Sequence, residues 1–132
     1  MADKSSLLFA FNNHFFEFVD DVQAVFPNDP DIMLTKNALI AIRKINPKLI
    51  IKIWHEFIAV KYQNEIARGD ISFFINKDYK NDLAVMGGMT SDSITSKIDA
   101  LREPIRNMGK ENQEKSMKYI INLSKISTIY NI

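Results

Sequence analysis

The chain of 132 residues has no cysteine, four glycines, four prolines and two histidines. The absence of cysteine excludes disulfides, thiolate zinc sites and cysteine nucleophiles. The scarcity of glycine and proline argues against a loop-rich or disordered chain. No apolar run reaches the roughly 18 residues of a membrane-spanning helix, and the first residues lack the pattern of a secretory signal. We therefore expect neither disulfides nor membrane insertion.

Length and composition are those of an ordinary globular protein, because 46% of the residues are apolar and 25% are charged. We expect one helical domain, 1–132. The net charge is only +1, but the charges are unevenly distributed. Residues 1–35 contain six acidic residues and one lysine, whereas residues 36–55 contain five basic residues and no acid. Such a separation favours oriented packing against a partner or against another copy of the chain.

Apolar residues recur at helical spacing in the first segment, 5–26. The stripe consists of Leu8, Phe11, Phe15, Phe18, Val22 and Val25. Further apolar residues widen this stripe, so we expect the helix to be buried on two sides and to form the centre of the core. Ser5 or Ser6 is the expected N-cap.

Further helices are predicted over 31–45, 47–68, 91–108 and 110–130, with a short one at 70–75. In 31–45 the residues expected to face inward are Leu34, Ala38, Leu39, Ala41, Ile42 and Ile45. In 47–68 they are Ile50, Ile53, Trp54, Phe57 and Val60. The fold class is therefore all-α, an irregular bundle of five to six helices.

The connections between these helices have recognisable signals. Asn46 and Pro47 are the expected N-cap and first residue of the third helix. Gly69 is placed to end it in the left-handed conformation. Pro104 should kink the helix 91–108, because proline removes a backbone hydrogen bond. The segment 76–90 is expected to be a flexible loop.

Neither histidine indicates a catalytic or metal site. His14 and His55 lie in different predicted helices, whereas a metal site or an acid–base pair needs convergent ligands or titratable groups. Glu17 lies one helical turn after His14, and Glu56 adjoins His55, so we expect both histidines to be satisfied polar groups at the edge of the core. An enzyme would need an unrecognised pair such as His55 and Glu56. We expect no catalytic residue, no cofactor and no metal.

The segment 36–52 is the strongest feature outside the predicted core. The candidate interaction residues are Lys36, Arg43, Lys44, Lys48, Lys52, Asp20 and Asp21. They indicate contact with a protein partner or self-association. The alternative is a nucleic-acid-binding surface formed by 36–52, which the nearly neutral total charge disfavours.

Four stretches carry a resemblance to known proteins. They are FNNHFFEF at 11–18, IIKIW at 50–54, FFINKDY at 73–79 and PIRNMG at 104–109. Together with the richness in isoleucine, lysine and asparagine, these stretches resemble small uncharacterised helical proteins of large double-stranded DNA viruses of algae and protists. The resemblance implies a viral protein in the cytoplasm of the infected host cell or in the virion, and transfers no site residue.

The sequence thus predicts a non-enzymatic structural or protein-interaction protein, such as a minor capsid or other virion component. A host-factor-binding modulator is a second alternative beside nucleic-acid binding.

Overall fold

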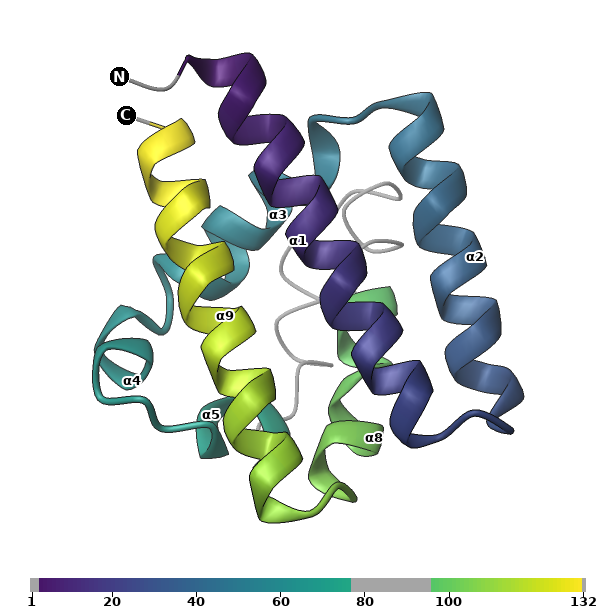
Figure 1. Cartoon of the computed structure of the whole chain (residues 1–132). Helices are drawn as coiled ribbons and strands as arrows, with labels where there is room; N and C mark the ends of the chain where they lie inside the picture. The colour runs from purple at the N-terminus through teal and green to yellow at the C-terminus, as the bar shows by residue number, and fades with distance from the viewer. Residues whose placement is uncertain (1–2, 77–95, 132) are drawn as a thin grey trace.

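A computed structural model describes residues 3–76 and 96–131 of the chain (Figure 1). Within these residues every regular element is helical and no strand occurs, so the prediction of an all-α bundle is confirmed. One continuous cluster of buried apolar side chains draws on all of the described helices. None of these helices combines the length and apolar character that crossing a bilayer requires.

Helix α1 (Lys4–Val25) is the centre of the bundle. Phe11, Phe15, Phe18 and Val22 of its predicted stripe are fully buried. The expected cap is wrong by two to three residues, because the N-cap is Asp3, whose carboxylate accepts a 2.8 Å hydrogen bond from the Ser6 amide. This hydrogen bond from the backbone is the main reason why the pKa of Asp3 is lowered.

Helix α9 (Lys110–Tyr130) matches the predicted range and packs along α1 in the opposite direction (Figure 1). The beginning of α1 and the end of α9 therefore lie near each other, and the Lys4 ammonium lies 5.6 Å from the centre of the Tyr130 ring. Met117, Ile120 and Leu123 of α9 are buried. The contact of α1 with α9 is the most extensive one between two helices of the bundle.

Helix α2 (Pro30–Ile45) lies at the edge of the bundle, on the other side of α1 from α9 (Figure 1). Asp29 caps it, accepting a 2.9 Å hydrogen bond from the Asp31 amide. The expected inward face is partly wrong. Ile32, Thr35 and Leu39 are buried, whereas Leu34, Ala41 and Ile45 are exposed.

The single helix predicted over 47–68 is divided into three pieces. Residues of α3 (Leu49–Trp54) lead into a π-helical turn η1 (His55–Ala59), and α4 (Gln63–Ala67) follows after a turn. The predicted N-cap Asn46 and first residue Pro47 are wrong by two residues, because Lys48 is the N-cap of α3 and has no side-chain cap bond. The Asn46 side chain instead accepts a hydrogen bond from the Lys48 amide in the turn before the helix.

Trp54 is the largest side chain of the core and joins three helices. Its ring meets Phe11 and Phe15 of α1 edge-on at centroid distances of 6.3 and 6.0 Å. Its indole N–H donates a buried 3.1 Å hydrogen bond to the Ser124 hydroxyl of α9. Because a buried donor without an acceptor is costly, this bond fixes α3 against α9.

Gly69 ends α4 as predicted, with φ +67°. The Asp70 amide donates to the Glu65 carbonyl, and the Gly69 amide donates to the Ile66 carbonyl. These two hydrogen bonds form a Schellman motif, the common glycine-containing end of an α-helix. Asp70 then caps α5 (Ser72–Asn76) by accepting from the Ser72 amide. The hydrogen bonds from Ser72, first that of its hydroxyl, lower the pKa of Asp70.

The predicted loop 76–90 lies outside the described residues, apart from Asn76 at the end of α5. Residues 96–99 are helical, 100 and 101 form a turn, and α8 (Arg102–Arg106) follows. The predicted kink at Pro104 is therefore wrong. Pro104 lies in the first turn of a new helix, where no hydrogen bond to residue 100 is needed. The Arg106 guanidinium donates to the Ile75 carbonyl and joins α8 to α5.

Candidate protein-interaction groove

The residues of opposite charge that the sequence indicated meet within the chain. Lys36 of α2 forms a 2.5 Å ion pair with Asp20 of α1, and its ammonium lies 3.4 Å from the Gln23 side-chain oxygen. Both members of the pair are thus engaged at the contact between α1 and α2. Part of the opposite charge of segments 1–35 and 36–55 is therefore paired within the chain itself.

Two more of the candidate residues also have partners in their own chain. The guanidinium of Arg43 lies 4.4 Å from the centre of the buried Phe16 ring, a cation–π contact. Asp21 is hydrogen-bonded to the Tyr119 hydroxyl. Burial first, and then this hydrogen bond, raise the pKa of Tyr119 to about 12.

The remaining candidates, Lys44, Lys48 and Lys52, are exposed. Within the described residues none of the three forms an ion pair. The basic segment 36–52 therefore divides into two cations held by the fold and three that face solvent.

The histidines lie in separate places. Nδ1 of His14 lies 3.6 Å from the Glu17 carboxylate, and the His14 ring lies 4.7 Å from the Tyr119 ring centre. His55 lies in the π-helical turn. Among the described residues no group of three or more histidine and acidic side chains is arranged to hold a metal ion.

A hollow of about 360 Å³ lies beside Tyr119, between α1 and α9. Its walls include Asp21, Lys115 and Lys118. His14, Tyr119 and Asn122 complete its lining, so charged and polar side chains of both signs surround it.

A larger and more apolar groove, of about 560 Å³, lies between α9 and the segment formed by η1 and α4. Ala59, Ile66 and the Ser124 side chain form buried parts of its wall. Val60 and Ile129 line it as well, and each is 53% exposed. The groove is thus an apolar surface that the fold itself leaves uncovered.

The π-helical turn explains why the groove exists. The Val60 amide donates to the His55 carbonyl at 3.0 Å, five residues back instead of four. This wider turn shifts the following side chains around the axis, and Tyr62 then leaves helical geometry with φ −117°. Val60 was predicted to face the core, and the extra residue in the turn places it half exposed instead.

The charge of the groove has one sign. Lys125, His55, Gln63 and Thr128 are the polar and charged side chains of its wall besides Ser124, and none of the described residues that line it is acidic. Lys125 is exposed. The surface therefore combines an apolar wall with cationic and hydrogen-bonding edges.

This groove was not predicted from the sequence. A continuous helical pattern over 47–68 gave no sign of the π-helical turn, because the apolar spacing before residue 55 fits an α-helix. The only available signal was Ile129, which falls outside the buried stripe of α9 and stays exposed.

Comparisons with known proteins identify no relative, since no family model, curated protein or solved structure matches the chain.

Proposed function

We propose that this chain is a non-enzymatic protein-interaction protein and that the groove between α4 and α9 binds an amphipathic helix of a partner protein. The observation that carries the proposal is the 560 Å³ apolar groove with no acidic residue among its described lining. Its volume lies within the range of about 300–1,000 Å³ that is typical of binding sites.

The shape of the groove favours a helix over a small molecule. Val60 and Ile129 are half exposed on its walls, so an occupant keeps one side in water. Small-molecule sites enclose most of their ligand, whereas an amphipathic helix inserts only its apolar face. Covering the remaining surface of each of these two side chains contributes on the order of 1 kcal/mol.

The charge of the groove indicates which charged residues the partner helix carries beside its apolar face. Lys125 is exposed on the wall, and His55 is the other ionisable side chain there. Complementary potentials favour the correct partner and its orientation. The partner helix therefore carries aspartate or glutamate next to its apolar face.

Selection from a displayed library of helical peptides tests this proposal. The library has an apolar face of varied residues, flanked by positions that allow acidic or basic side chains. We expect selected binders to carry acids at the flanks, and we expect Lys125→Glu to shift the preference toward lysine and arginine. Flanks without charge preference on either chain overturn the proposed partner.

A variant that fills the groove locates the site. Ala67 is exposed and lines the groove, so Ala67→Trp should weaken peptide binding roughly tenfold or more, a change of about 1.4 kcal/mol. The matched control is Ala10→Trp, at an exposed alanine of α1. Binders that tolerate Ala67→Trp, or that are lost equally with Ala10→Trp, contradict the groove as the binding site.

The resemblance to proteins of large DNA viruses supports a viral setting, in which the partner is another virion protein or a host factor. Mass spectrometry of purified particles checks whether the chain is a virion component, and its absence there leaves the infected cell as its place of action.

Nucleic-acid binding is a second candidate, supported by the exposure of Lys44, Lys48 and Lys52. It predicts a mobility shift of labelled DNA or RNA whose affinity falls steeply as salt rises. If no shift occurs at low ionic strength, this alternative is excluded.

A further inference from the structure

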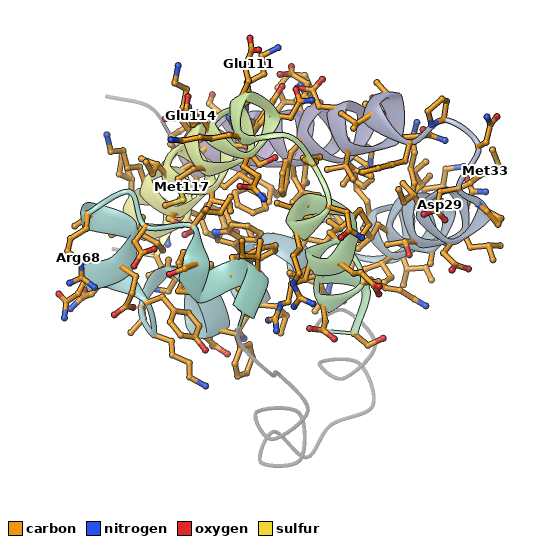
Figure 2. The ribbon with its side chains drawn as sticks, turned by 90° about the horizontal axis from the view of Figure 1, so that it is seen from below. Asp29, Met33, Arg68, Glu111, Glu114 and Met117 are labelled. Carbon is orange, nitrogen blue, oxygen red and sulfur yellow. The ribbon has the colours of Figure 1, made fainter. Side chains whose placement is uncertain are left out.

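The outer face of α2 is a second uncovered apolar surface, far from the groove in the bundle. Its stripe consists of Leu34, Ala38, Ala41 and Ile45, which follow one another at spacings of four, three and four residues. Leu34 is 66% and Ile45 is 83% exposed. Met33 beside them is 49% exposed, and Figure 2 shows it at the outer edge of the molecule. A stripe of helical period marks a face that packs against something.

The bundle covers another face of α2. Its buried residues Ile32, Thr35 and Leu39 face the interior, and α2 packs against α1 and α3. The sequence therefore specifies two packing faces on one helix, of which the fold uses one.

The outer face is complementary to itself when two copies run in opposite directions. A two-fold axis between Asn37 and Ala38 brings Leu34 of each copy to the level of Ala41 of the other. Leu34 of each copy then lies opposite a small side chain, which allows the two helices to approach within about 8–10 Å.

The charges at the two ends of α2 agree with this arrangement. Asp29 and Asp31 lie at its beginning, and Arg43 and Lys44 lie in its last turn. Running two such helices antiparallel places an acidic end beside a basic end, whereas a parallel pair would join like charges. Lys36 does not take part, because it is paired with Asp20 within its own chain.

We propose that α2 docks against α2 of a second copy of this chain, antiparallel and about this two-fold axis. The inference is independent of the groove, which lies on other helices. One helix face buries less than the roughly 800 Å² per partner of a standard stable interface. The product is therefore a dimer that forms and dissociates with concentration.

Sedimentation at rising protein concentration and low salt tests the dimer. We expect the average mass to increase toward twice that of one chain, and we expect Leu34→Glu or Ile45→Glu to keep the chain monomeric. The control is Phe9→Glu, since Phe9 of α1 is also 70% exposed but lies outside the stripe. Circular dichroism verifies that each variant is folded. A native chain that stays monomeric at about millimolar concentration, where even weak complexes form, overturns the proposal, as does equal loss of the dimer in Phe9→Glu.

Discussion

Helices α1 and α2 differ in how far the rest of the chain covers their apolar faces. Each has apolar residues on more than one side of its axis. In α1 both sides are covered, because α9 packs on one of them and α2 with α3 on the other. In α2 one side is covered, and Leu34 and Ile45 on the other remain exposed.

This difference shows what an apolar stripe specifies. The period of 3.6 residues identifies the faces of a helix that avoid water, but it does not say whether the covering surface belongs to the same chain. A helix at the centre of a bundle receives that cover from its neighbours. A helix at the edge has neighbours on one side only, so its second stripe is left for a partner.

The largest expected effect is a difference in the free energy of unfolding between a substitution at a covered position and one at an uncovered position. Phe15→Ala in α1 removes a fully buried ring that lies 6.0 Å from Trp54 and 5.5 Å from Phe16, measured between ring centres. The cavity should lower the free energy of unfolding by about 3–5 kcal/mol. Leu34→Ala in α2 should change it by less than about 0.5 kcal/mol. Urea unfolding of dilute protein measures both.

Dilution is essential to this measurement, because a dimer that binds through α2 adds stability at high concentration. A loss of several kcal/mol in dilute Leu34→Ala contradicts the assignment of that side chain to an uncovered face. A small effect of Phe15→Ala contradicts the place of α1 at the centre of the core.

The helical class was predictable from the sequence because its signals are local. The stripe of α1, the beginning and end of α9, and the left-handed Gly69 depend on residues within a few turns of one another. The inward face of α2 was not predictable to the same degree. Its two stripes share one helix, and only the arrangement of α1 and α3 decides which of Leu34 and Leu39 is buried.

The candidate site was less predictable than the fold. The charge segments indicated interaction, yet Asp20 and Lys36 bond to each other across two helices, a contact that only the packing of α1 on α2 reveals. The groove depends on the π-helical turn at 55–59, whose single extra residue leaves no trace in a pattern of apolar spacing.

The next largest effect is expected in the pH dependence of stability, through Tyr119 at the contact between α1 and α9. Burial and the hydrogen bond with Asp21 raise the pKa of Tyr119 from 10.0 to about 12. The folded state therefore holds this proton more tightly than the unfolded state. The resulting stability is complete below pH 10 and is lost as the pH rises through about 12.

Urea unfolding at a series of alkaline pH values measures this contribution. Between pH 10 and about 12 the native chain should lose more stability than Tyr119→Phe, which has no phenol to ionise. Tyr130→Phe is the matched control, since it removes a tyrosine from the last position of α9. Equal losses in the native chain and Tyr119→Phe contradict the pKa shift.

The smallest expected effect concerns the ion pair between α1 and α2. The Lys36 and Asp20 side chains are 27% and 54% exposed, so solvent screens their attraction. A double-mutant cycle with Asp20→Ala and Lys36→Ala should give a coupling of roughly 0.2–1 kcal/mol at low salt. The coupling should decrease at about 1 M salt, where the screening length is near 3 Å. Gln23→Ala, which removes the other partner of Lys36, should leave the coupling nearly unchanged. A coupling of several kcal/mol that salt does not reduce is incompatible with an exposed pair, and would mean that charge, and not the buried side chains Ile32 and Leu39, holds α2 against the bundle.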